Sequence, residues 1–297
     1  MRALLCVLLW AAAVPAWAAL NIFACTPEWG ALAKELGGDQ AAVYTATSAL
    51  QDPHRIEARP SLIARARSAD LVVCTGADLE AGWLPLVLSQ SGNARIQSGR
   101  PGYFEAARHA FMRDVPASVD RAQGDIHAAG NPHIHLDPRN VERIAAALAQ
   151  RMRALDAVDA ITYAERAHAF GSRWKEAIAR WEKLAAPLHG MAVVVHHKDL
   201  SYLNGWLGMR EIGTLEPKPG LPPTTAHLGE LLSRLAQEPA KAVLRSGYSD
   251  PRASEWLSQR AMIPAVALPF TVGGSDRAQD LFGLFDDTIA RLLAVPR

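Results

Sequence analysis

Short apolar runs alternate with helical patterns along most of this chain, and that alternation limits the folds open to it. The strand-like runs lie at residues 21–25, 43–47, 71–75, 192–195, 242–245 and 265–268. The helical patterns lie at 29–36, 60–67, 201–207, 227–236, 253–259 and 280–293. Strands that alternate with helices across short connections are typical of α/β proteins with parallel sheets. The sequence therefore predicts an α/β fold with mostly parallel sheets flanked by helices.

The middle of the chain carries longer helical patterns. One follows Asp137-Pro138, and a second, between about 160 and 186, repeats aromatic residues every three or four positions until Pro187. A helix of ~25 residues is ~38 Å long, enough to run the length of a two-lobed molecule. We predict an N-terminal α/β lobe at residues 20–158, one long rigid linking helix at 159–186, and a C-terminal α/β lobe at 187–297.

The first nineteen residues have the pattern of a secretory signal. Arg2 is followed by an apolar run over residues 3–14, and Ala16-Trp17-Ala18 supplies small residues at a cleavage site. The run is too short for a membrane span, which needs ~20 residues. We predict a signal peptide at residues 1–19, a periplasmic location, and no stable membrane insertion.

Composition narrows the range of partners. Without Arg2 the chain has 30 basic and 30 acidic residues, and this balance argues against nucleic acid as a partner. We expect a monomer. Cys25 and Cys74 remain after export, and they are either a disulfide or two buried thiols; their spacing does not indicate a metal site.

Three of the ten histidines lie where a strand ends or a loop turns. His54 follows the second strand, His133 precedes the long helical pattern, and His197 directly follows the strand at 192–195. Ligands of open α/β sheets bind beyond the carboxyl ends of the strands. Three imidazoles that converge there suit a divalent transition metal, with zinc preferred over Ca²⁺ and Mg²⁺. A histidine ligand also needs an acceptor for its second nitrogen, and Asp52 or Asp137 is available.

These residues resemble the metal-binding segments of one known family. Asp52-Pro-His54 with Arg59-Pro-Ser61, Asn131-Pro-His133 with Leu136-Asp-Pro138, and His197 five residues before Tyr202 look like its three ligand segments. The chain resembles, over nearly its whole mature length, the zinc- and manganese-binding proteins of bacterial ABC importers.

The resemblance implies a function and a set of ligands. The chain would capture Zn²⁺, with Mn²⁺ as the alternative cargo, in a cleft between two lobes, and deliver it to a membrane permease. His54 and His133 would bind the metal from the first lobe and His197 from the second. The fourth ligand is left open, because the carboxylate expected after the last strand is absent from its place. Asp276, His127 or a water are the candidates, and Asp276 is favoured.

A zinc-dependent hydrolase is the main alternative. His133-x-His135-x-Asp137 superficially resembles a metallohydrolase cluster, and an open zinc position can activate water. The chain has no H-E-x-x-H motif, nucleophile elbow, phosphate loop or dinucleotide fingerprint. We therefore expect a binding protein and not an enzyme.

Overall fold

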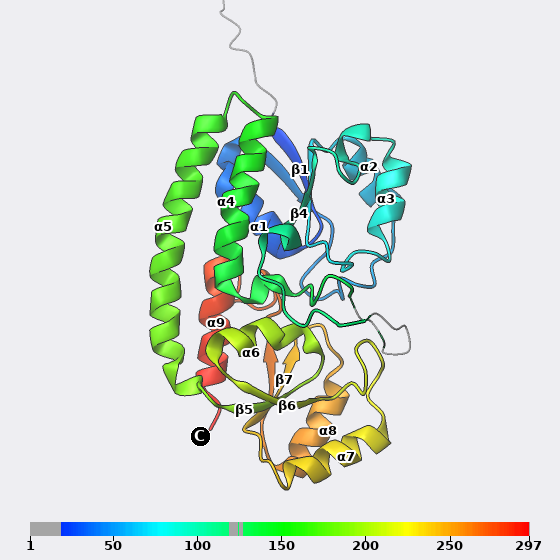
Figure 1. The fold of residues 1–297 in the computed structure, drawn as a ribbon, viewed down its shortest axis with the longest axis vertical. Coiled ribbons are helices and arrows are strands. Elements are labelled where there is room, and N and C mark those ends of the chain that lie inside the picture. The colour runs from blue at the N-terminus through cyan, green and yellow to red at the C-terminus, as the bar shows by residue number, and fades with distance from the viewer. Residues whose placement is uncertain (1–18, 119–123, 125–126, 297) are drawn as a thin grey trace, which may run out of the picture.

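The computed structural model describes residues 19–118, 124 and 127–296. It contains two parallel four-stranded sheets, with strand orders β2-β1-β3-β4 and β6-β5-β7-β8. Each sheet is flanked by helices and forms one of two lobes, stacked one above the other in Figure 1. The predicted α/β class and the two-lobed arrangement are confirmed.

The N-terminal lobe contains the first four strands. Its strands are β1 (Leu20–Ala24), β2 (Ala41–Thr45), β3 (Leu71–Cys74) and β4 (Tyr103–Glu105), and its helices are α1 (Pro27–Gly37), α2 (Pro60–Arg67), α3 (Leu84–Ser91) and α4 (Pro138–Leu155). The C-terminal lobe repeats the strand order of the N-terminal sheet. Its strands are β5 (Ala192–Val195), β6 (Arg210–Thr214), β7 (Ala242–Ser246) and β8 (Ala265–Leu268), and its helices are α6 (Ser201–Leu207), α7 (Thr225–Leu235), α8 (Pro251–Ala261) and α9 (Leu281–Leu293).

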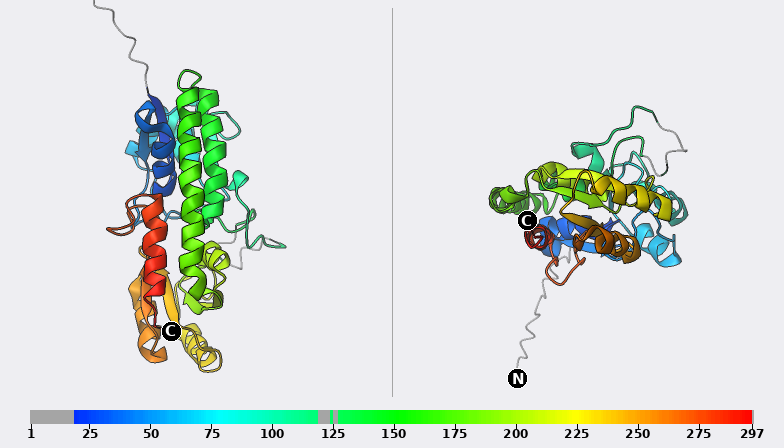
Figure 2. Two further views of the ribbon diagram at one scale, coloured as in Figure 1. Left: turned by 90° about the vertical axis from the view of Figure 1, so that its left-hand side faces the viewer. Right: turned by 90° about the horizontal axis from the view of Figure 1, so that it is seen from below.

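The long helix α5 (Ala160–Ala185) links the two lobes, as predicted, and runs along one side of both (Figure 1). Its buried face is aromatic: Phe170, Trp174 and Trp181 are fully buried. The rings of Phe282 and Phe285 on α9 pack against Trp174 at centroid distances of 4.9 and 5.6 Å. Figure 2 shows α9 lying beside α5 and reaching up toward α1. One hydrophobic core therefore continues from lobe to lobe along α5.

The sequence identified most of these elements but not all. The bounds of α2, α6, β5 and β8 match the prediction residue for residue, whereas α3, β4 and β6 were not identified. Strand β4 has only three residues, and β6 contains Gly213 beside an irregularity in its pairing with β5. Both are outer strands with weak alternation, which explains why periodicity missed them. The exact domain boundaries remain predictions, and residues 1–18 of the predicted signal peptide lie outside the described residues.

Cys25 and Cys74 form a disulfide, which decides between the two states left open by the sequence. Cys25 directly follows β1 and Cys74 ends β3, and these strands are neighbours in the sheet. The bond therefore joins the carboxyl ends of two adjacent strands. Both cysteines are fully buried.

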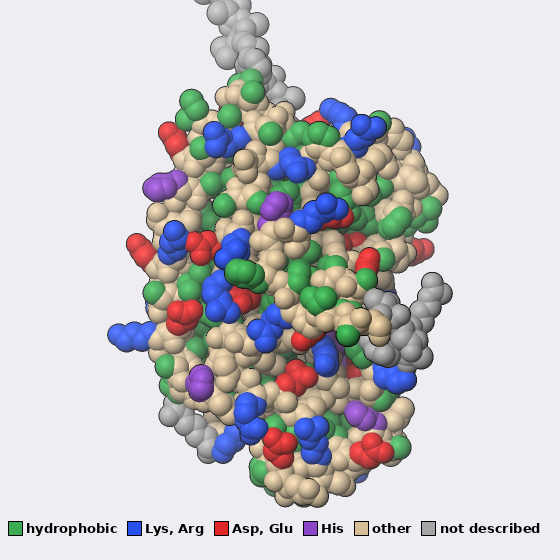
Figure 3. All heavy atoms as spheres, viewed as in Figure 1, with side chains coloured by type: hydrophobic (Ala, Val, Ile, Leu, Met, Phe, Trp, Pro, Cys, Tyr) green, Lys and Arg blue, Asp and Glu red, His purple; other side chains and the backbone are tan. Residues whose placement is uncertain are grey.

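The surface in Figure 3 shows basic and acidic side chains interspersed, without a large area of one sign. In the described part of the chain, no helix is both long and apolar enough to cross a bilayer.

Candidate metal centre

Three segments meet between the lobes and bring the three predicted histidines together: the loop after β2 carries His54, the segment before α4 carries His133, and the loop after β5 carries His197. The imidazole ring of His54 lies 5.3 Å from that of His133 and 5.9 Å from that of His197, measured between centroids. The rings of His133 and His197 are 5.4 Å apart. Residues separated by 143 positions in the sequence thus form one compact group, with two histidines from the N-terminal lobe and one from the C-terminal lobe.

Two of the histidines are held by the same local turn. The side-chain oxygen Oδ1 of Asp52 accepts from the backbone N–H of His54 at 3.0 Å and lies 2.9 Å from its Nδ1. Asn131 does the same for His133, at 3.0 and 2.8 Å. A proline separates the members of each pair and restricts the turn. The Asx-Pro-His pattern, which occurs twice, is the sequence signal for this turn. Of the two acceptor residues, Asp52 and Asn131, only Asp52 was predicted.

The third histidine is held by a residue that sequence reasoning missed. Oε2 of Glu216 lies 2.7 Å from Nδ1 of His197 and also accepts from the backbone N–H of Gly220 at 2.8 Å. Glu216 lies just beyond β6, the neighbour of β5 in the sheet. Because β6 was not identified, nothing in the sequence placed a carboxylate at this strand exit.

The hydrogen bonds fix which nitrogen of each ring faces the centre. Each Nδ1 faces an acceptor oxygen and so carries the proton, which leaves the lone pair on Nε2. The Nε2 atoms of His54 and His133 are buried and have no hydrogen-bond partner among the described residues. One ligand atom from each of the three histidines lies within 4.8 Å of the other two. Tetrahedral zinc at ~2.0–2.1 Å needs these atoms about 3.4 Å apart, so small side-chain movements would complete the shell.

The electrostatics of the site favour a divalent cation. Burial, with the neighbouring histidines, holds the pKa of His133 well below its ordinary value, so this ligand is neutral at neutral pH. Burial also lowers the pKa of His197, but its hydrogen bond to Glu216 and the nearby carboxylates outweigh this and raise it. Asp52 and Glu216, one from each side of the cleft, place a carboxyl group behind the imidazoles of His54 and His197, and such groups favour a cation at the centre.

A fourth histidine lies beside the group. The ring of His127 is 5.4 Å from that of His54, a separation within the range found among the three clustered histidines. It also contributes to the field at His133. His127 belongs to the connection that precedes Asn131, so this fourth imidazole comes from the side of the N-terminal lobe.

The favoured fourth ligand, Asp276, is not brought to the histidines. Its side chain is exposed. The loop that carries it is closed on itself: Gly273 N–H donates to the carbonyl of Ala278 at 2.6 Å, and Ser275 donates to Asp287 of α9 at 2.6 Å. This closure keeps Asp276 at the surface beside α9.

The hydrolase-like cluster is also not formed. Asp137 accepts from the backbone N–H of Arg139 at the start of α4 and pairs with its guanidinium, so of the two predicted acceptors, Asp52 and Asp137, only Asp52 holds a histidine. His135 is buried and directs its Nε2 to the carbonyl of Phe270 at 2.9 Å. His133, His135 and Asp137 therefore have separate partners and no common centre.

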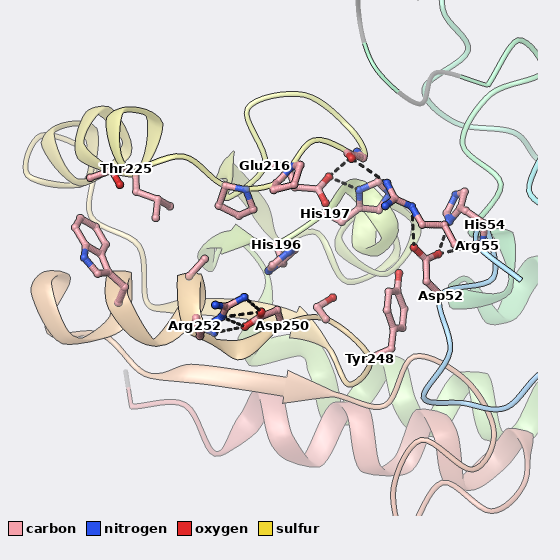
Figure 4. Close-up of a pocket in the computed structure, with 17 residues that line it drawn as sticks. Asp52, His54, Arg55, His196, His197, Glu216, Thr225, Tyr248, Asp250 and Arg252 are labelled. Carbon is pink, nitrogen blue, oxygen red and sulfur yellow. Dashed lines mark hydrogen bonds and ion pairs between the residues drawn. The ribbon is translucent and has the colours of Figure 1, made fainter.

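A cavity of about 660 Å³ opens from the histidines into the C-terminal lobe (Figure 4). His54 and His197 line one end, together with Asp52 and Glu216, and Tyr248 points toward Asp52 in the view. The walls beyond come from the loop after β6 and from the start of α8. The site is therefore a cleft site with an opening to one side, and not a sealed core position.

Two α/β lobes with imidazoles converging from both define a class: two-lobed binding proteins that hold a metal ion in the interlobe cleft. Comparison with known proteins gives the family. The chain belongs to the family described as ZnuA, zinc-uptake complex component A, periplasmic, whose model matches residues 22–294. Members of this family are the periplasmic substrate-binding components of ABC importers.

Individual relatives are distant. The chain is 23% identical over 216 residues to the high-affinity zinc uptake system protein ZnuA of Yersinia pestis, and the match covers 64% of either protein. It is 25% identical over 241 residues to the iron-binding protein YfeA of the same organism, covering 71% of this chain and 69% of that protein.

Solved structures share the fold over almost their full length. A crystal structure of ZnuA superposes with a TM-score of 0.76 at 19% identity, covering 92% of this chain and 99% of that one. A manganese-bound periplasmic metal-binding protein from Candidatus Liberibacter asiaticus gives a TM-score of 0.74 at 14% identity, with 92% and 98% covered.

Proposed function

We propose that this protein captures Zn²⁺ in the periplasm, through His54, His133 and His197, and delivers it to the permease of an ABC importer. The observation that carries the proposal is the state of the three rings. Each Nδ1 is occupied by an oxygen acceptor, and the buried Nε2 atoms of His54 and His133 have no partner among the described residues. Rings fixed in this way present lone pairs to a common point, which is the arrangement that a metal ion requires.

The donor set favours zinc over manganese. Zinc accepts imidazole nitrogen readily, whereas manganese prefers oxygen ligands and binds most sites more weakly. The family model describes zinc uptake, while one relative is named as iron-binding and one similar structure holds manganese. Manganese is thus the alternative cargo, and the three imidazoles of this chain argue for zinc.

We assign the fourth position to His127 in place of Asp276. The ring of His127 is as close to His54 as the rings of the clustered histidines are to one another. A fourth nitrogen would complete a tetrahedral shell and leave no open position to activate water, which is the chemistry expected of a carrier and not of a hydrolase.

Delivery and location complete the proposal. Residues 1–19 would direct export, and the mature protein would act as a monomer that docks on its permease. The family description and the signal-like N-terminus support the periplasm. The opening at one side of the cleft supports release without unfolding.

Competition titration of metal-free protein against a zinc chelator, repeated with manganese, tests both cargo and ligands. We expect zinc to bind the wild type more tightly than manganese. His54→Ala should weaken zinc binding by more than the ~10–100-fold that loss of an outer hydrogen-bond partner costs. His127→Ala should weaken it measurably.

Two matched variants serve as controls. His168→Ala removes an exposed histidine of α5, and Asp276→Ala removes the exposed carboxylate; both should retain wild-type affinity. Loss of zinc affinity in Asp276→Ala, with none in His127→Ala, would reverse the assignment of the fourth ligand. Equal affinity of His54→Ala and His168→Ala would refute the metal centre.

A further inference from the structure

A buried polar cluster joins the two lobes close to the three-histidine centre. Glu28, in the first turn of α1, accepts from the hydroxyl of Thr271 at 2.5 Å and from that of Thr26 at 2.6 Å. Thr26 belongs to the same lobe as Glu28, whereas Thr271 follows β8 of the other lobe. Nδ1 of His135 lies 3.7 Å from Glu28. The cluster is buried: Glu28, His135 and Thr271 are each no more than 2% exposed.

A second bond crosses between the lobes beside the first. Nε2 of His135 donates to the carbonyl of Phe270, the residue before Thr271, at 2.9 Å. Separation of the lobes at this point would break both bonds: Glu28 would keep the hydroxyl of Thr26 but lose that of Thr271, and the carbonyl of Phe270 would lose His135. A buried carboxylate that loses one hydrogen-bond donor is destabilised, because burial leaves it few alternative partners.

The segment held by these bonds contacts a proposed ligand. The Phe270 ring lies 5.7 Å from the ring of His133 and 4.9 Å from that of His135, nearly perpendicular to both. It also contacts the ring of Tyr248, which lines the cleft, at 5.1 Å. Movement of Phe270 and Thr271 relative to α1 would therefore disturb the packing around His133 and the distance from His133 to His197.

We propose that Glu28 and Thr271 form an interlobe clamp, a pair of positioning residues. The clamp holds the C-terminal ligand His197 close enough to the N-terminal ligands for all of them to reach one metal ion. The clamp touches no metal. It acts by fixing the spacing of the lobes before cargo arrives, which lowers the rearrangement needed to bind and slows release. The effect of the clamp on metal release rests on the proposed function. Its effect on the spacing of the lobes does not.

Thr26 provides a matched control for the clamp. Thr26→Val and Thr271→Val each remove one buried hydroxyl that donates to the same carboxylate, and both threonines are 2% exposed. Only Thr271→Val breaks a bond between the lobes. Thr271→Ser keeps the hydroxyl and should restore wild-type behaviour. If Thr271 served only to donate a hydrogen bond to Glu28, the two valine variants would have equal effects.

The first measurement is zinc release into excess chelator, with the absorption spectrum of the Co²⁺-loaded protein as a report on coordination geometry. We expect zinc to leave Thr271→Val roughly tenfold faster than wild type, which is the size of effect that the loss of one buried hydrogen bond would produce. The Co²⁺ spectrum should change in this variant. Thr26→Val and Thr271→Ser should remain close to wild type in both measurements.

The second measurement needs no metal. Spin labels at the exposed positions Gln90 of α3 and Glu230 of α7, introduced as cysteines, report the distance between the lobes. In the metal-free protein we expect a broader and longer distance distribution for Thr271→Val than for Thr26→Val. Equal distributions, or equal zinc release from the two valine variants, would overturn the clamp. A wild type that binds no zinc would instead refute the proposed function, and the label distances would still test the clamp.

Discussion

The disulfide between Cys25 and Cys74 ties β1 to β3, and its removal has a magnitude that can be worked out. The two residues are 49 positions apart. A cross-link that closes a loop of about 50 residues restricts the unfolded chain by about 4 kcal/mol at 25 °C in the chain-entropy model. The paired substitution Cys25→Ala with Cys74→Ala should therefore lower the free energy of unfolding by about 4 kcal/mol, plus a smaller loss from the removed sulfur atoms.

Urea unfolding of metal-free protein, followed by tryptophan fluorescence, measures this difference. Wild-type protein unfolded and refolded in excess thiol reductant should resemble the double variant, because both lack the cross-link. The zinc stoichiometry of the folded double variant should equal that of wild type, since the cysteines form no part of the histidine group. A loss of less than about 1 kcal/mol would refute the reasoning, because it would mean that the cross-link does little to restrict the unfolded chain.

Three further predictions concern the site and its surroundings. Glu216→Gln should weaken zinc binding by ~10–100-fold in a competition titration, because His197 loses the carboxylate that fixes its ring, and unchanged affinity would contradict that role. Burial raises the pKa of Glu80 to about 7 from an ordinary 4.5, against hydrogen bonds from the N–H groups of Thr75 and Gly76. The folded protein therefore retains this proton longer than the unfolded chain, so stability falls as the pH rises from 4.5 to about 7. Measured as the difference in unfolding free energy between wild type and Glu80→Gln, this loss should be about 3 kcal/mol, and a difference independent of pH would contradict it. Tyr202→Phe should lower the free energy of unfolding by about 1 kcal/mol, because the Tyr202 hydroxyl donates to the carbonyl of Asn131 and accepts from the backbone N–H of Arg113. An unchanged melting temperature would contradict that contribution.

The sequence predicted the histidines of the site better than the residues that hold them in place. His54 and His197 were found because each follows a strand, and ligands of parallel sheets bind beyond the carboxyl ends of the strands. His133 was found in the proline-containing loop before the long helical pattern. Their convergence to 5.3–5.9 Å between ring centroids agrees with that reasoning.

The supporting residues were harder to foresee because they depend on contacts between distant segments. Glu216 required β6, whose weak pattern concealed it, and Thr271 required knowledge of how the lobes face each other. Asn131 was within reach, since Asx-Pro-His occurs twice. Asp276 was favoured for its place after the last strand, but closure of the loop at Gly273 and Ser275 cannot be read from a Gly-Gly sequence.

The central claim is that one metal ion is held by imidazole nitrogens from both lobes. An anomalous difference map, from crystals of the zinc-loaded protein measured on both sides of the zinc absorption edge, tests it most directly. The account predicts one strong peak at ~2.0–2.1 Å from Nε2 of His54, His133 and His197. A peak elsewhere in the cleft, or one bonded to histidines of a single lobe, would contradict it.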